Sequence, residues 1–258
     1  MNVTLTSTYH DTDARLLYMF EDCIPKLREL YGDMSVVVSP LTHESAKRRL
    51  IELGVNVQSA SENGRGYIYR KALEMGLSSR GEYIHYCDWD RILHWISRYS
   101  SELSRVLQGR LDCECLVLER TRGAHRSHHA PLYYSEVPVN RVLTYLLRLN
   151  RYRDFLSASF VASKEVVQTI VELSTEPGFG FYGEWPVIVF AKGYKVGFAR
   201  VRGLEWETPD RFRKEIGVKG YGRWLRGFET SAEWKGRVRI ADEIVAGALN
   251  AAGKLIHR

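Results

Sequence analysis

The chain has 258 residues, of which 45% are hydrophobic and 26% charged, an ordinary composition for a globular protein at the upper end of single-domain size. No apolar run approaches the roughly 20 residues that a membrane-spanning helix needs, and the first residues lack the basic and then apolar layout of a signal peptide. The four cysteines form no C-x-x-C pair and no zinc-binding spacing. We therefore expect one domain in the reducing cytoplasm.

Strands and helices alternate through the first half of the chain. Apolar, β-branched runs predict the strands, and apolar residues at helical spacing predict the helices between them. The expected strands are residues 2–8, 36–38, 55–60 and 83–87, and the expected helices are residues 14–30, 42–53, 66–77 and 92–106. This alternation implies right-handed β-α-β crossovers and a mainly parallel sheet sandwiched by helices, which is an α/β fold.

The second half of the chain is less regular. Its expected strands are residues 116–119, 157–161 and 195–201, its expected helices are residues 137–149, 164–173 and 184–193, and residues 120–134 are expected to form a polar loop. Residues 208–258 are predicted to be a helical tail, whose last helix begins near residue 233.

The net charge of +6 is concentrated in one stretch of this second half. Residues 120–153 contain seven arginines and a single acid, Glu136, and so account for the whole excess. A local basic field of this kind favours an anionic ligand, such as a phosphorylated acceptor, a lipid phosphate or nucleic acid. The alternative is a surface that only keeps the protein soluble.

Polar clusters follow the first, third and fourth expected strands. They are Tyr9-His10-Asp11, residues 59–66 and Asp88-Trp89-Asp90. Ligands of open parallel sheets bind beyond the carboxyl ends of the strands. Two carboxylates one residue apart can hold a divalent cation there and leave its other positions for water and a diphosphate. The alternative is that Asp88 only caps the helix that follows.

With these motifs the chain resembles the GT-A glycosyltransferases, the nucleotide-diphospho-sugar transferase superfamily that includes the family 2 enzymes, over about residues 1–200. Residues 62–76 resemble the family's glycine and asparagine segment before its third helix, and residues 82–90 resemble its strand and DxD motif. Residues 203–210 are similar to a segment of little-characterised prokaryotic members. The resemblance implies a Rossmann-like GT-A fold with a C-terminal helical extension, hexosyltransferase activity and a nucleotide diphosphate sugar as donor.

The resemblance also implies a metal site and a catalytic base. Asp88 and Asp90 would bind Mn²⁺ or Mg²⁺ bridging the donor's diphosphate, which places Asp90 among the catalytic residues. Family 2 enzymes carry an acidic pair just after a glycine, and one of its members deprotonates the acceptor. Here only Glu184 follows Gly183, so Glu184 is the candidate base. The alternative is that Glu184 merely favours the start of a helix.

For the donor nucleotide, the resemblance implies a site made by Tyr9, Asp11, Asn63, Arg65 and Asp88. Tyr9 and Asp11 match positions that contact the nucleoside, and Asn63 and Arg65 match the loop that faces the base or the diphosphate. Arg65 would bring a fixed positive charge to the phosphates. The alternatives are that Tyr9 packs in the core and that Arg65 is a solvated arginine at the start of a helix.

We expect the acceptor to bind near the basic stretch 120–153. The candidate acceptor-side residues are Arg122, His125, Arg126 and Asp154, with plain surface exposure as the alternative for the histidine. The single domain 1–258 is accordingly divided into a nucleotide-sugar-binding half (1–119), an acceptor-side half (120–202) and a helical tail (203–258). The basic stretch is also compatible with contact between the protein and a membrane surface.

Other functions are compatible with parts of the sequence. A sugar-phosphate nucleotidyltransferase would share the sheet, but such enzymes carry a glycine-rich loop after the first strand, and residues 7–12 contain no glycine. A non-enzymatic nucleic-acid-binding protein could use the basic stretch 120–153, although no known nucleic-acid-binding motif is found there. Nucleic acid is therefore not the expected partner.

Overall fold

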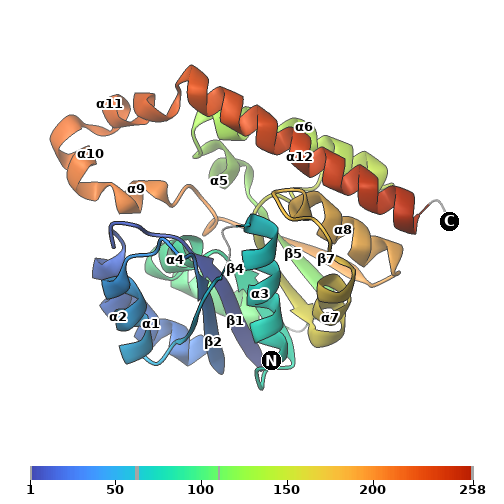
Figure 1. Cartoon of the computed structure of the whole chain (residues 1–258), viewed down its shortest axis with the longest axis horizontal. Helices are drawn as coiled ribbons and strands as arrows, with labels where there is room; N and C mark the ends of the chain where they lie inside the picture. Colours follow the sequence, from blue (N-terminus) through green and yellow to red (C-terminus); the bar gives the residue numbers. More distant parts are fainter. Residues whose placement is uncertain (1, 62–63, 110, 257–258) are drawn as a thin grey trace.

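The computed structural model describes residues 2–61, 64–109 and 111–256, and its centre is a seven-stranded sheet of order β3-β2-β1-β4-β6-β5-β7 (Figure 1). The strands are Val3–Tyr9 (β1), Asp33–Val38 (β2), Asn56–Ser59 (β3), Tyr83–Cys87 (β4), Cys115–Arg120 (β5), Ser159–Ser163 (β6) and Val196–Val201 (β7). β6 runs antiparallel to β4 and β5, and the other neighbouring pairs are parallel. The predicted mainly parallel α/β sheet is confirmed.

Helices cover both faces of this sheet. They are Leu17–Leu30 (α1), Glu44–Glu52 (α2), Arg65–Leu77 (α3), Trp89–Gln108 (α4), Arg122–Arg126 (α5), Ala130–Leu146 (α6), Lys164–Leu173 (α7), Phe181–Ala191 (α8), Thr208–Arg211 (α9), Arg213–Lys219 (α10), Tyr221–Leu225 (α11), the 3₁₀ turn Arg226–Phe228 (η1) and Ser231–Leu255 (α12). Over the part of the chain that is described, no helix combines the length and the apolar character that crossing a membrane requires.

The alternation of side chains along each strand divides the core between the two faces. In β2, Val36 and Val38 join the apolar cluster of α1, α2 and α4, whereas Val37 joins the cluster of α3, α7 and α8. A third cluster lies between α6, α8 and α12. The run Val36 to Val38 of β2 is continuous and apolar because this strand is buried on both faces, which is why the sequence pattern predicts it well.

Residues 120–134 differ most from the prediction, because the expected polar loop contains α5 and the start of α6. The hydroxyl of Thr121 accepts a hydrogen bond from the Ala124 N–H at 3.2 Å and so caps α5. Pro131 lies in the first turn of α6, where a proline needs no N–H partner. The other boundaries shift less: α8 begins three residues before the expected position, and α12 begins at Ser231. The division into a donor half, an acceptor half and a tail stays a prediction.

The close contact between α8 and α12 depends on glycine. A Cβ atom on Gly247 would overlap the backbone of Gly180, and one on Gly183 would overlap the carbonyl oxygen of Ile244. Helices that approach this closely leave no space for a side chain at the crossing, because protein interiors have few voids.

We predict that Gly247→Ala lowers the free energy of unfolding by about 1–3 kcal/mol, because the added methyl group forces the two helices apart. Gly236→Ala is the matched control on the same helix, since among the described residues no heavy atom beyond the adjacent helix backbone lies within 4 Å of its Cβ position. It should stabilise the protein by up to about 1 kcal/mol, the difference in helix propensity. Urea unfolding of both variants measures the effect, and equal stabilities would contradict the glycine contact.

Candidate active site

A cleft of about 510 Å³ opens at the carboxyl ends of β1, β2 and β4, large enough for a small ligand. Its lining comes from the end of β1, the loop after β2, the start of α3, the β4–α4 junction and α9. The acidic residues of this lining are Asp88 and Asp90, and Arg65 and Arg211 are its arginines. The cleft therefore lies where parallel α/β sheets bind their ligands.

Asp88 occupies the N-cap position of α4 but makes no capping hydrogen bond with its side chain. Instead, its Oδ1 accepts hydrogen bonds from the hydroxyls of Tyr86 at 2.7 Å and Thr8 at 3.2 Å. Its Oδ2 lies 3.7 Å from Nε of Arg91, too far for a hydrogen bond. Burial, with a further contribution from Asp90, raises the pKa of Asp88 against the opposing effect of Arg91. The alternative that Asp88 serves as a cap is wrong.

Asp90 lies in the first turn of α4 and accepts hydrogen bonds from one backbone N–H and one guanidinium. Its Oδ1 accepts the Arg91 N–H at 2.9 Å, and its Oδ2 accepts a hydrogen bond from Arg211 at 2.8 Å. Burial would raise the pKa of Asp90, but Arg211 and Arg91 outweigh burial and lower it. Arg211 also donates to the carbonyl oxygen of His10 at 2.7 Å. A guanidinium from the helical tail thus lies against the acidic side of the cleft.

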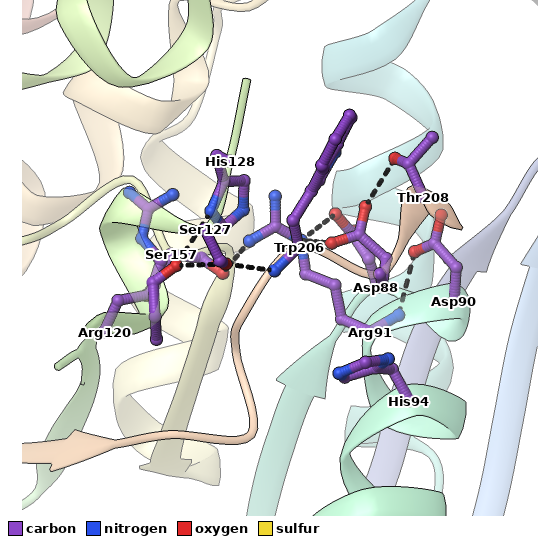
Figure 2. Close-up of polar contacts among 12 residues, drawn as sticks. Asp88, Asp90, Arg91, His94, Arg120, Ser127, His128, Ser157, Trp206 and Thr208 are labelled. Atoms are coloured by element: carbon purple, nitrogen blue, oxygen red, sulfur yellow. Dashed lines mark hydrogen bonds and ion pairs between the residues drawn. The ribbon is translucent and has the colours of Figure 1, made fainter. Parts of the chain in front are cut away.

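Arg91 connects these aspartates to the rest of the molecule (Figure 2). It donates to the carbonyl oxygen of Ser157 at 2.8 Å, and its Nε lies 3.9 Å from Oε2 of Glu207. Glu207 is 8% exposed, and among the described residues its Oε2 has no hydrogen-bond partner. Burial raises the pKa of Glu207 and Asp90 adds to the effect, whereas Arg91 opposes it. The sequence motifs do not single out Arg91, Glu207 and Arg211, although the acidic segment after β7 is a signal for this part of the site.

The chemistry of the two aspartates fits a hard divalent cation. Carboxylate oxygens are the ligands that Mg²⁺ and Mn²⁺ prefer, and Oδ2 of Asp88 lies 3.7 Å from Nε of Arg91, outside hydrogen-bond distance. Within the described ranges, no three His, Cys, Asp or Glu side chains converge as a complete metal site. Protein ligands would therefore supply part of the coordination sphere, and a bound ligand and water the rest.

Tyr9 and Asp11 are each 2% exposed, and Tyr9 is part of the cleft lining whereas Asp11 is not. The Tyr9 hydroxyl donates to Oδ2 of Asp11 at 2.7 Å, and the same oxygen accepts the Leu16 N–H at 3.0 Å. The Tyr9 ring packs against Phe20 and Trp89, and burial raises its pKa. The structure thus uses Asp11 to fix the turn before α1. Of the other expected donor residues, Arg65 lines the cleft, and Asn63 lies outside the described residues.

The acceptor-side residues divide into a buried pair and an exposed pair. Asp154 accepts a hydrogen bond from Nε of the fully buried Arg120 at 2.7 Å, and His125 lies 3.3 Å from Glu136. Arg122 and Arg126 are exposed. A second cavity, of about 700 Å³, is lined by Arg122, His125 and Asp154 but not by Arg126. His125 and Asp154 are therefore not the exposed loop residues that the basic composition of this stretch suggests.

Glu184 is 4% exposed and does not line the cleft. Its Oε2 accepts a hydrogen bond from the Ser174 hydroxyl at 2.6 Å, and its Oε1 accepts the Thr175 N–H at 2.8 Å. The Thr175 hydroxyl and the Glu176 N–H bond to the same carboxylate. In this position Glu184 stabilises the turn after α7, and nothing in its surroundings supports a role as catalytic base.

No family model and no curated protein sequence matches the chain. Solved structures of glucosyl-3-phosphoglycerate synthase from Mycobacterium tuberculosis do match it. The complex with Mn²⁺, uridine diphosphate and phosphoglyceric acid is 15% identical, with a TM-score of 0.59, over 98% of this chain and 78% of that chain. A complex with phosphoglyceric acid gives 15% identity and a TM-score of 0.60 over 98% and 80% of the two chains. A complex with Mg²⁺ and uridine diphosphate gives 16% and 0.52 over 77% and 69%.

These matches define the class of fold. The chain has the Rossmann-like GT-A fold of nucleotide-diphospho-sugar glycosyltransferases, as its sequence motifs predicted. The roles of individual residues in the cleft stay predictions.

The buried pair of Arg120 and Asp154 leads to a prediction about stability and pH. Burial would raise the pKa of Asp154, but the adjacent Arg120 outweighs burial and holds it below its usual value. Such a carboxyl stabilises the fold above its unfolded pKa of about 3.9 and loses this contribution as the pH falls below it. Asp154→Asn should therefore cost about 3–5 kcal/mol at neutral pH, since the buried Arg120 loses one of its two carboxylate partners and keeps only Glu136.

The cost of Asp154→Asn should shrink in acid, where the wild type also loses the charged pair. Asp22→Asn is the control, because Asp22 is exposed, and it should change stability by less than about 0.5 kcal/mol. Denaturant unfolding at several pH values measures both variants. A difference from wild type that does not depend on pH would contradict the charged pair.

Proposed function

We propose that this protein is a metal-dependent glycosyltransferase that moves a sugar, expected to be a hexose, from a nucleotide diphosphate sugar to an anionic acceptor. The observation that carries the proposal is the pair Asp88 and Asp90 in a cleft at the carboxyl ends of β1, β2 and β4 of a GT-A fold. The matching synthase was solved with Mn²⁺, UDP-glucose and phosphoglyceric acid, the combination of ligands that the proposal requires.

In this proposal Asp88 and Asp90 hold Mn²⁺ or Mg²⁺, which supplies positive charge for the leaving diphosphate. The hydroxyls of Thr8 and Tyr86 fix Oδ1 of Asp88 and leave its Oδ2 for the metal. Arg65 lies in the same lining and offers a second positive charge to the phosphates. Glycosyl transfer also needs a group that takes the proton of the acceptor hydroxyl. The contacts of Glu184 do not favour this role for it.

The cavity of about 700 Å³ beside β5 and α6 supports an anionic acceptor. Four exposed arginines line it, namely Arg122, Arg141, Arg151 and Arg200. Its acids are Glu119 and Asp154, which already pair with Arg153 and Arg120. The exposed charge of the cavity is therefore positive, which suits a phosphate or carboxylate group. A cytoplasmic location and contact with a membrane surface stay predictions.

The metal and donor site is tested by calorimetry with UDP-glucose and GDP-mannose in the presence and absence of Mn²⁺. We expect Mn²⁺-dependent binding of one of them. Asp88→Ala and Asp90→Ala should weaken binding or turnover by about 100-fold or more, because several kcal/mol of charge stabilisation are lost. Asp242→Ala, at an exposed position on α12, is the control and should behave as wild type. Binding that is unchanged in the Asp88 and Asp90 variants would overturn the proposal.

The acceptor cavity is tested with 3-phosphoglycerate as the probe. The double variant Arg122→Glu, Arg141→Glu should weaken its binding by at least about tenfold, because charge-assisted hydrogen bonds are lost. Arg126→Glu is the matched control, since Arg126 is exposed on the same short helix as Arg122 but does not line the cavity. Equal affinities of the double variant and the Arg126→Glu control for 3-phosphoglycerate would exclude this cavity as the anion site.

A further inference from the structure

A chain of hydrogen bonds ties the loop after β1 to the loop after β2 at the edge of the cleft. Nδ1 of His10 lies 2.7 Å from the Ser39 hydroxyl, which lies 3.1 Å from the Thr42 hydroxyl. The Thr42 hydroxyl donates to the carbonyl oxygen of Tyr9 at 3.1 Å, and the Ser39 N–H donates to the same oxygen at 2.9 Å. His10 and Ser39 both line the cleft.

Counting protons along this chain fixes the tautomer of His10. A hydroxyl has one proton to donate, and that of Thr42 goes to the Tyr9 carbonyl. Ser39 must therefore donate its own proton to Thr42, which leaves its oxygen as the acceptor for His10. His10 then carries its proton on Nδ1, and Nε2 presents a lone pair. No described residue forms a hydrogen bond with this Nε2.

The surroundings keep the imidazole uncharged. Burial, and then the positive charges of Arg65 and Arg211, lower the pKa of His10, against weaker opposing effects of Asp11 and Asp90. At neutral pH Nε2 is thus an acceptor in a cleft where the two neighbouring cations attract carbonyl oxygens. Asp11, the carboxylate that the family resemblance assigned to the nucleoside, is already bonded to Tyr9 and the Leu16 N–H.

We propose that His10 is the residue that selects the base of the donor, with Nε2 accepting the imino N–H of a uracil. This inference rests on the proposed function. Uracil carries a ring N–H donor, and the acceptor Nε2 matches this group. Cytosine and adenine present a ring nitrogen lone pair at the corresponding place, which the lone pair of Nε2 would repel. Ser39 and Thr42 are positioning residues that set the tautomer.

The test is calorimetric titration with UDP, CDP, ADP and N3-methyl-UDP in the presence of Mn²⁺. Wild type should prefer UDP to the other three by about tenfold or more, the value of one well-placed hydrogen bond. His10→Phe should weaken UDP binding to the level of the other nucleotides and leave their affinities unchanged. If UDP binds but N3-methyl-UDP binds equally well, or if His10→Phe keeps the preference, the inference fails alone. If no nucleoside diphosphate binds, the proposed function fails with it.

The positioning role has its own measurement. In ¹⁵N-histidine spectra, His10 should show the Nδ1-protonated tautomer, assigned by its disappearance in His10→Phe. Ser39→Ala should shift the tautomer ratio and reduce the preference for UDP over CDP, and Thr42→Ser, which keeps the hydroxyl, should preserve both. An unchanged tautomer in Ser39→Ala would show that the hydroxyl chain does not orient the imidazole.

Discussion

The hydrogen bonds from the hydroxyls of Thr8 and Tyr86 to Asp88 are the constraint on which the site depends. The parallel register of β1 and β4, which pairs Thr6 with Tyr86, brings the end of β1 beside the start of α4. A carboxylate at this helix start would ordinarily bond to the free N–H groups of the first turn. Here two hydroxyls from adjacent strands hold Oδ1 of Asp88 instead, and these hydrogen bonds partly offset the desolvation of the carboxylate.

Arg91 compensates the negative charge that this arrangement concentrates. Its side chain is 12% exposed and lies near the carboxylates of both Asp88 and Glu207. Burial works against its charge, but Glu207 and Asp88 outweigh burial and keep its pKa well above the usual value. By also bonding to the Ser157 carbonyl, Arg91 joins the acidic cleft to the segment before β6. A permanent cation therefore lies between the proposed donor and acceptor sides.

The sequence predicts those parts of the fold that short-range patterns control. Apolar β-branched runs such as Val36 to Val38 mark strands buried on both faces, and the strand-to-helix junctions place the polar clusters at one sheet edge. The histidine-rich segment after β5 is different, because His125 is buried beside Glu136, a partner eleven positions away on α6. A pairing between residues this far apart leaves no local pattern in the sequence. A segment that forms a buried polar network therefore has the same sequence pattern as a polar loop.

The same limit applies to the candidate site. The spacing of Asp88 and Asp90 was sufficient to locate the cleft, since it depends on one strand end. That Asp11 is taken up by Leu16 and Tyr9, and that Glu184 holds the turn at Ser174, follows from how separate segments meet in three dimensions. Residue type and spacing therefore indicate where chemistry can occur, whereas the contacts of each side chain decide whether it is free to take part.

The hydrogen bond between Arg211 and Asp90 affects how a cation would bind in the cleft. In the proposed function, a metal ion that bound Oδ2 of Asp90 would compete with a guanidinium that is already bonded to this oxygen and to the carbonyl oxygen of His10. Binding of the cation there would release a tethered positive group. The released Arg211 side chain would then be available to an incoming anion, so one ligand would free the group that attracts the next.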